Sequence, residues 1–318
     1  MLVNFKVSNF ASFNELQELS MSAGKVRAHS ERLYTDNKNK ILKFMAIYGA
    51  NASGKSNLVG AFEFAKSIIL DGFPNESSSL FCKLKDENQD KISRFEFTIL
   101  INGKKYNYGF EVVLATQSFK TEWLYELTYG TNKKVIFERN VFEETFTVNT
   151  YFKGGTINER LNIYAEDIKN DSSVLFLSIM NKNKDPLYES NKEIRLYKKI
   201  FNWFKFRLSV NFSDRPVTNY SYLLNEDSIE EISKLLNDFG TGVSKFTLAD
   251  VSIEKITNNV PKELIKEITD NLAEQQKFFE QKNIERTPAI MLRSAEDATM
   301  FIIKLNEIGI SAQTLQFN

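Results

Sequence analysis

The stretch of sequence that decides the fold is Gly49-Ala50-Asn51-Ala52-Ser53-Gly54-Lys55-Ser56. It fits the pattern Gly-x-x-x-x-Gly-Lys-Ser/Thr at every fixed position, which is the pattern of a loop that cradles the phosphates of a nucleotide. The two glycines permit a sharp turn and a close approach of backbone to phosphate. Backbone N–H groups of residues 51 to 56 then point at the anion. The stretch therefore predicts a nucleoside triphosphate site.

Two side chains of this loop have expected roles of their own. Lys55 is the candidate for phosphate stabilisation, because its ammonium can bridge the β- and γ-phosphates as a point charge. Ser56 is the candidate Mg²⁺ ligand, because this ion keeps most of its waters and takes few protein groups. The residues expected to hold ATP and Mg²⁺ are Gly49, Ala50, Asn51, Ala52, Ser53, Gly54, Lys55, Ser56 and Asn57.

The segments on either side of the loop agree with this interpretation, because such a loop joins a strand to a helix. Lys40–Tyr48 is an apolar run that ends at Gly49, and it predicts a central strand buried on both faces. Apolar residues then recur at three- and four-residue spacing through Lys55–Leu70 and predict a helix. A glycine turn that matched the pattern by chance would lack both flanks.

The composition is that of a soluble globular protein, with 42 % apolar and 26 % charged residues. Basic and acidic residues number 41 each, so no overall positive field favours DNA, and binding to DNA would need a local patch. Cys82 is the single cysteine, which excludes an internal disulfide and fits a reducing compartment. We expect a cytoplasmic location without a membrane partner, since neither a signal peptide nor a bilayer-spanning run is found.

The remaining pattern predicts an α/β fold. Strands are expected over 2–7 and 16–21, and a polar, mobile loop over 75–90. The β-rich stretch 95–149 surrounds Asn102-Gly103, the strongest short hairpin signal, and predicts an antiparallel meander. Further helices are expected over 191–204, 228–237 and 261–282, and strands over 289–292, 300–305 and 313–317. Asp227 and Gly240 are the expected caps of the middle helix.

Other residues that could carry chemistry have simpler explanations. His29 is the only histidine and stands in a polar stretch, which favours a solvated loop residue over a catalyst. Trp123 and Trp203 lie on apolar faces and are expected in the core. A short basic run beside the phosphate loop comprises Lys38, Lys40 and Lys43. A solvated face is favoured there over a DNA contact.

The loop and an N-terminal segment together resemble a known class. Gly49 to Asn57 reads Gly-x-Asn-x-Ser-Gly-Lys-Ser-Asn, and Asn9-Phe10-Ala11-Ser12-Phe13 precedes it. Both resemble the ABC-type ATPases of the RecF, SMC and OLD branch, many of which carry a basic residue where Ala11 stands. The meander around 95–111 and the segment Leu235–Val243 resemble bacterial AAA-family ATPases linked to restriction and phage defence.

The resemblance implies a P-loop NTPase of ABC/RecF-like type, with a mixed central sheet, an antiparallel β-meander subdomain and a helical subdomain. It divides the chain into an N-terminal lobe of the ATPase core (1–93), the β-subdomain (94–155), the helical subdomain (156–285) and a return to the core sheet (286–318). It further implies a homodimer formed on ATP binding and a possible effector nuclease or toxin as partner.

The chain departs from this class in the groups that cut ATP. Members carry a strand of four apolar residues followed by Asp-Glu, and a signature segment that reaches the partner's nucleotide. Neither is found, since Ala289–Leu292 is followed by Arg293 and Phe301–Ile303 by Lys304. Phosphoryl transfer depends on groups that hold the metal and align the water. We therefore expect a C-terminally incomplete ATPase that binds ATP and is inactive alone.

Two functions remain open at this point. The first is an ATPase that dimerises on ATP and switches a phage-defence, restriction or DNA-repair complex, so that ligand binding and assembly are linked. The second is a non-hydrolysing, nucleotide-dependent scaffold or sensor that regulates a partner nuclease or toxin. A small-molecule kinase is disfavoured, because the loop follows two strands and no arginine-bearing lid is found.

Overall fold

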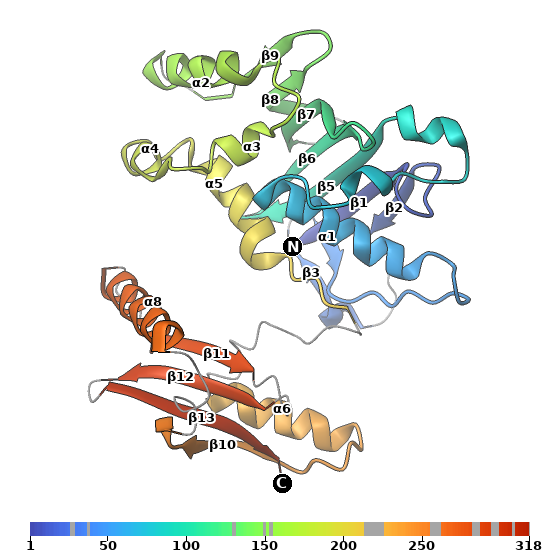
Figure 1. The fold of residues 1–318 in the computed structure, drawn as a ribbon. Helices are drawn as coiled ribbons and strands as arrows, with labels where there is room; N and C mark the ends of the chain where they lie inside the picture. Colours follow the sequence, from blue (N-terminus) through green and yellow to red (C-terminus); the bar gives the residue numbers. More distant parts are fainter. Residues whose placement is uncertain are drawn as a thin grey trace. The chain divides into compact units, whose positions relative to one another are not determined.

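The protein forms two compact units, Met1–Phe212 and Ser213–Asn318, in a computed structural model (Figure 1). The structure describes residues 1–25, 29–36, 39–128, 132–148, 151–152, 155–212, 226–254, 262–281, 287–293, 299–306 and 309–317. Among these residues, no helix has the length and apolar character needed to cross a membrane.

A seven-stranded sheet organises the first unit, and every neighbouring pair of its strands runs antiparallel. Its strands, in spatial order, are β2 (Gln17–Ser20), β1 (Leu2–Ser8), β5 (Ser93–Ile101), β6 (Lys104–Val113), β7 (Ser118–Leu127), β8 (Lys133–Asn140) and β9 (Thr145–Thr147). Asn102 and Gly103 join β5 to β6 with φ of 51° and 76°, the left-handed pair that a type I′ turn requires. The hairpin and the antiparallel meander are confirmed.

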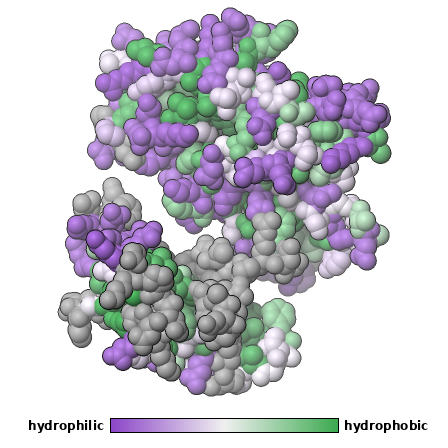
Figure 2. Space-filling model, viewed as in Figure 1, coloured by the Kyte–Doolittle hydropathy of each residue, from purple (hydrophilic) through white to green (hydrophobic). Residues whose placement is uncertain are grey.

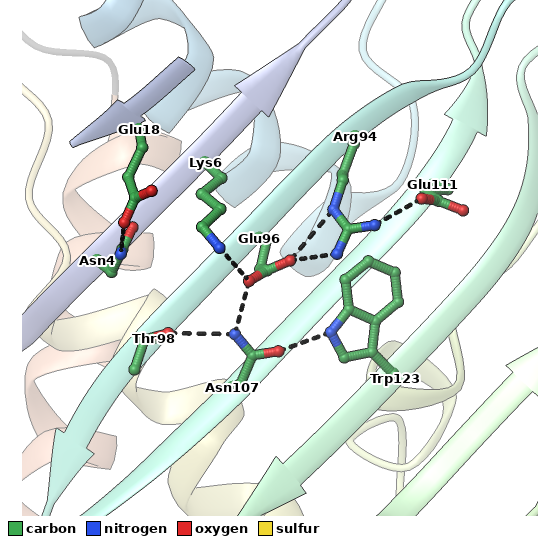
Figure 3. A network of polar contacts seen from close by, with 9 residues as sticks. All are labelled: Asn4, Lys6, Glu18, Arg94, Glu96, Thr98, Asn107, Glu111 and Trp123. Carbon is green, nitrogen blue, oxygen red and sulfur yellow. Dashed lines mark hydrogen bonds and ion pairs between the residues drawn. The ribbon is translucent and has the colours of Figure 1, made fainter. Parts of the chain in front are cut away.

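The two faces of the sheet differ in chemistry because side chains alternate along each strand. In β5, Phe95, Phe97 and Ile99 are fully buried on one face. Arg94, Glu96 and Thr98 occupy the other face (Figure 3). The apolar face carries the helices, and the polar face carries a network of charged side chains.

Helix α1 (Lys55–Asp71) follows the phosphate loop directly and packs on the apolar face. Its buried residues are Ala61, Phe64, Ala65, Ile68 and Ile69. The Phe62 ring stacks on Phe5 of β1 with centroids 4.1 Å apart, and Phe64 lies 5.4 Å from Phe95 of β5. Each buried aromatic side chain contributes roughly 1.5–3 kcal/mol of transfer free energy. The helix predicted over Lys55–Leu70 is confirmed.

A second group of helices follows β9 in the first unit (Figure 1). It contains α2 (Gly155–Ile168), α3 (Phe176–Ile179), α4 (Asp185–Ser190), α5 (Arg195–Asn202) and the π-helical turn η4 (Trp203–Arg207). Its members α3 and η4 contact α1. The Phe204 ring meets Phe97 edge-on at 5.0 Å, so η4 joins the same aromatic core. Phe176 and Leu177 of α3 are fully buried in this core.

The side chain of Asn9 fastens the chain at the end of β1. Its amide nitrogen donates to the carbonyls of Asn88 (2.8 Å) and Lys91 (3.0 Å). Its oxygen accepts the backbone N–H of Cys82 at 3.2 Å. These bonds hold residues 75–90 as an ordered segment with two 3₁₀ turns, η2 (Ser77–Ser79) and η3 (Asp86–Asp90). Local polarity predicts a loop here but does not report these partners some eighty residues away.

The second unit is a four-stranded antiparallel sheet with helices. Its strands, in spatial order, are β10 (Phe246–Val251), β13 (Gly309–Phe317), β12 (Met300–Asn306) and β11 (Ala289–Arg293). Helix α8 (Lys262–Gln281) packs Ile268 and Leu272 against this sheet. Helix α6 (Glu226–Asp238) begins one residue before Asp227, which is therefore not its N-cap, and Gly240 follows it with φ of 65° as predicted. The predicted first residue of α8, Pro261, lies outside the described residues.

The division of the chain differs from the predicted one. The predicted boundary between 93 and 94 falls inside a continuous sheet, because β1 pairs with β5. The predicted helical subdomain 156–285 is cut at Phe212. The described strands of residues 286–318, β11 to β13, form one sheet with β10 through the pairing of β13 with β10, and they do not join the first sheet. The described strands form no parallel pair, so the mixed central sheet is not seen among them. These boundaries depend on which strands pair with one another. Local sequence patterns do not show the pairing of strands that are distant in sequence.

The strand predicted over Lys40–Tyr48 is also corrected. Only Lys40–Leu42 is extended and paired, as β4 beside β3 (Leu33–Thr35). Phe44 is 79 % exposed and Tyr48 is 90 % exposed. A strand that is apolar on both faces needs neighbours on both edges, and no described strand pairs with residues 43–48. The segment that leads into the loop therefore presents apolar side chains to solvent.

The Asn9 bonds give a prediction about stability. Asn9→Ala should lower the free energy of unfolding by about 2–4 kcal/mol, because three hydrogen bonds are lost and buried backbone groups keep no partner. Asn181→Ala is the control, since this amide donates only to Leu177 in its own helical turn, and its cost should be at most about 1 kcal/mol. Urea unfolding measures both. Equal losses would contradict the role given to Asn9.

Candidate phosphate-binding site

The loop Gly49–Ser53 lies exposed at the N-terminal end of α1. The backbone N–H of Ser53 donates to the carbonyl of Ala50 at 3.2 Å and closes a turn inside the loop. Ala52 and Gly54 have φ of 62° and 92°. Left-handed backbone of this kind costs a non-glycine residue roughly 1–2 kcal/mol. The loop thus holds a strained shape at the mouth of the helix, which is common at ligand sites.

Both fixed glycines of the pattern are required by close contacts. A Cβ atom on Gly49 would stand 2.7 Å from Ser53 Oγ. A Cβ atom on Gly54 would stand 2.9 Å from Ser12 Oγ and 3.4 Å from the Phe13 ring. The two distances to serine hydroxyl oxygens are below van der Waals contact, so a side chain at either glycine would require a serine to move.

The N-terminus of α1 is open to an anion. Gly54 is its N-cap, no side chain caps the helix, and no acidic residue stands in its first turn. The first N–H groups of a helix have no partner within it, and the helix dipole places partial positive charge there. A phosphate group bound at this end would accept hydrogen bonds from these N–H groups. The residues present therefore fit a nucleotide phosphate.

Lys55 and Ser56 complete the polar surface of the loop. Lys55 Nζ donates to the carbonyls of Gly49 (2.8 Å) and Ala50 (2.7 Å), so the ammonium lies within the curve of the loop. Ser56 is exposed, and its hydroxyl makes no hydrogen bond with the part of the chain that the structure describes. An exposed hydroxyl beside a bound phosphate suits Mg²⁺, which is held by few protein groups.

The structure gives Asn57 a different partner from the predicted nucleotide. Its amide nitrogen donates to Ser12 Oγ at 2.8 Å. Ser12 belongs to the Asn-Phe-Ala-Ser-Phe segment, residues 9–13, which lies against Gly54. In the sequence, this segment stands out only through its resemblance to the RecF, SMC and OLD branch. No local pattern links positions 12 and 57, so their contact could not be found from spacing.

The surroundings of the other residues singled out in the sequence give none of them a role in the phosphate loop. The His29 side chain is exposed and lies 3.2 Å from Glu31, as expected of a solvated loop residue. Trp123 and Trp203 are each 6 % exposed. Trp203 packs in the hydrophobic core as predicted, but the apolar face predicted for Trp123 is wrong. Trp123 lies on the polar face of the sheet, where its indole N–H donates to Asn107 Oδ1 at 2.8 Å (Figure 3). Lys43 Nζ donates to the carbonyl of Glu31 at 3.1 Å. Lys40 is exposed, and Lys38 lies outside the described residues.

The polar face of the seven-stranded sheet is the other candidate site (Figure 3). It forms a groove of about 750 Å³ whose floor includes Trp123. Glu96 lies at the centre, with Lys6 Nζ at 3.5 Å, Arg94 Nε at 3.1 Å and Asn107 Nδ2 at 3.0 Å. Arg94 also reaches Glu111 at 2.9 Å. Opposite charges at the centre of the groove are paired with one another, so these groups stabilise the sheet.

Two buried carboxyl groups in this sheet have pKa values shifted in opposite directions. Burial alone would raise the pKa of Glu96, but hydrogen bonds from Arg94 and Asn107 and nearby positive charges outweigh it and lower the pKa. Glu122 of β7 is 1 % exposed and accepts the backbone N–H of Phe176 at 2.6 Å. Burial dominates there and raises the pKa of Glu122 despite that bond.

These shifts predict opposite effects on pH dependence. The lowered pKa of Glu96 adds stability above its ordinary value of 4.5, which is lost as pH falls. The raised pKa of Glu122 costs stability as pH rises above 4.5. Glu96→Gln should therefore reduce the gain in unfolding free energy between about pH 4 and about pH 7, and Glu122→Gln should increase it. Urea unfolding at both pH values tests this, and changes of the same sign would contradict it.

On the face shown in Figure 2, hydrophilic side chains cover most of residues 1–212, and hydrophobic side chains appear among them in small groups. Exposed apolar residues next to the phosphate loop are Phe44, Ile47 and Tyr48. An exposed apolar segment beside a polar ligand loop is the kind of surface that a binding partner covers.

One comparison with known proteins identifies the family. The family model of an AAA domain, described as a putative AbiEii toxin of a type IV toxin–antitoxin system, matches residues 44–254. The match covers more than half of the 318 residues and includes the phosphate loop, α1 and the strands from β5 to β9. No curated protein matches the chain. The chain therefore belongs to this AAA domain family and is a P-loop NTPase.

Proposed function

We propose that this chain binds ATP with Mg²⁺ through Gly49–Asn57 and that the bound nucleotide drives its self-association. The observation that carries the proposal is the uncapped N-terminus of α1, which begins after a left-handed Gly54 and has Lys55 curled beside it. The family match supports nucleotide binding and ATPase chemistry in general. The specific nucleotide, the metal ligand and the assembly are our inference.

Each residue of the loop would bind a different part of the nucleotide and its metal ion. The N–H groups at the start of α1 would donate hydrogen bonds to phosphate oxygens, and Gly54 keeps that approach free of a Cβ atom. Lys55 can exchange its carbonyl partners, Gly49 and Ala50, for phosphate oxygens, which makes a stronger charge-assisted bond. Ser56 would hold Mg²⁺, whose chemistry when bound is to neutralise charge on the phosphates.

Self-association is supported by how open the site is. Gly49–Ser53 are exposed, so a triphosphate bound there keeps one side in water. Phe44, Ile47 and Tyr48 add exposed apolar surface in the segment that leads into the loop. A second copy of the chain that covers the bound triphosphate and this apolar surface would bind only when nucleotide is present. Nucleotide binding and dimerisation are then linked. The ABC/RecF-like arrangement implied by the Gly49–Asn57 sequence is of this kind.

A non-hydrolysing sensor of a partner toxin or nuclease is the second candidate. It is favoured by a specific feature: the apolar runs Ala289–Leu292 and Phe301–Ile303 are followed by Arg293 and Lys304 instead of an Asp-Glu pair. A carboxylate that holds the metal's waters or aligns the attacking water is a regular part of phosphoryl transfer. The matching family is described as a putative toxin of a type IV toxin–antitoxin system. Phage defence is therefore the proposed context for either candidate.

Replacement of Lys55 and Ser56 tests nucleotide binding. Lys55→Ala should weaken ATP binding in the presence of Mg²⁺ by at least about tenfold, because a charge-assisted phosphate contact is lost. Ser56→Ala should remove most of the dependence of affinity on Mg²⁺. Isothermal titration calorimetry measures both. Lys66→Ala is the control, because this lysine of α1 donates to the carbonyl of Leu208, away from the loop. Wild-type affinity in Lys55→Ala would exclude the loop as the site.

Assembly and turnover are tested separately from binding. Light scattering should show a monomer without nucleotide and a dimer with ATP and Mg²⁺, and Lys55→Ala should stay monomeric. Dimerisation that is the same with and without nucleotide would contradict ligand-driven association. Phosphate release above background, abolished by Ser56→Ala, would exclude the non-hydrolysing candidate.

A further inference from the structure

We propose that Ser12 and Asn57 form a brace that fixes the phosphate loop in its binding geometry, so that both are positioning residues for nucleotide binding. This inference rests on the proposed function, since it concerns the same loop. It also changes the role of Asn57, which acts through Ser12 instead of touching the nucleotide.

The contact joins two parts of the chain that are far apart in sequence. Asn57 Nδ2 donates to Ser12 Oγ at 2.8 Å across 45 positions. The same hydroxyl would lie 2.9 Å from a Cβ atom on Gly54, and the Phe13 ring lies at 3.4 Å from that point. Residues 12 and 13 therefore support the loop where its backbone is left-handed and where the open N–H groups of α1 begin.

The segment that carries Ser12 is itself rigid. Phe10 and Phe13 exchange two backbone hydrogen bonds of 3.0 and 2.8 Å, which closes the segment into a tight loop. The N–H of Ala11 donates to the carbonyl of Leu80 at 2.8 Å. Asn9 adds its three side-chain bonds to residues 82–91. Ser12 is thus held by a closed loop that is fastened on both sides.

Phe10 ties this segment to the body of α1 as well. It is 3 % exposed, and its ring lies 5.1 Å from Phe64 of α1 and 5.4 Å from Phe95 of β5. The segment therefore touches α1 at Asn57 in the first turn and at Phe64 farther along. Two contacts on one helix fix the direction in which its N-terminus points.

The phosphate loop has few other supports. Gly49–Ser53 are exposed, and the described hydrogen bonds within the loop are those of Lys55 and the Ser53–Ala50 turn. A loop that is not held must be ordered by its ligand, and that ordering reduces affinity. A loop held in place presents its N–H groups in the right direction before the ligand arrives. The brace supplies this preorganisation.

A double-mutant cycle on ATP binding tests the brace. Ser12→Ala and Asn57→Ala should each weaken binding of ATP with Mg²⁺ by about three- to tenfold, the size of one hydrogen bond. The double variant should be no weaker than either single variant, because both remove the same bond. Ser12→Thr keeps the hydroxyl and should restore most of the affinity. Additive losses would show that Asn57 contacts the nucleotide independently, and would overturn the proposal.

Two further measurements separate positioning from folding and from base recognition. Thr121→Ala removes a similar bond, from Thr121 Oγ1 to Glu111 Oε2 at 2.8 Å, on the polar face of the sheet, opposite the face that carries α1. It should leave ATP affinity unchanged, and Ser12→Ala should lower the melting temperature without ligand no more than Thr121→Ala does. Inorganic tripolyphosphate with Mg²⁺ should show the same loss in Ser12→Ala, whereas a loss confined to ATP would contradict a brace of the phosphate cradle.

Failure of the brace is distinguishable from failure of the proposed function. If wild type and Lys55→Ala bind ATP equally, the loop is not the site and the proposed function falls. If Lys55→Ala loses binding and Ser12→Ala binds as wild type does, the site stands and the brace is excluded.

Discussion

The packing of α1 on the aromatic face of β1 and β5 is the constraint on which the rest of the structure depends. Phe62 stacks on Phe5, and Phe64 packs between Phe10 and Phe95. These contacts fix the axis of the helix relative to the sheet. Because the phosphate loop is the N-terminal extension of that helix, they also fix where its open N–H groups lie. The packing of the core therefore sets the position of the ligand site.

Asn9 and its neighbours extend this constraint from the core to the loop. Phe10 anchors the segment in the aromatic layer, Asn9 fastens it to residues 82–91, and Ser12 meets Asn57. The opposite face of the sheet is stabilised differently, by the paired charges around Glu96. The apolar face of the sheet thus packs against the helices and supports the phosphate loop. The charged side chains at the centre of the polar face pair with one another.

The sequence was sufficient for features with local causes. The phosphate loop, the helix after it and the Asn102-Gly103 hairpin follow from glycine conformation, helical spacing and turn chemistry, and the structure contains them. Features that depend on distant partners were missed or misplaced. Lys40–Tyr48 has the composition of a buried strand, yet pairing decides whether a strand forms, and only Lys40–Leu42 is paired. The Asn9 and Ser12 contacts likewise join positions with no shared local pattern.

In the proposed function, backbone N–H groups at the start of α1 bind the phosphates of ATP. Nuclear magnetic resonance of ¹⁵N-labelled protein observes those groups directly during titration with ATP and Mg²⁺. We expect saturable shifts that are largest for the amides of Ser53, Gly54, Lys55 and Ser56, with the same binding curve for each. Unchanged amides at these positions, with or without shifts elsewhere in the chain, would contradict the proposed function.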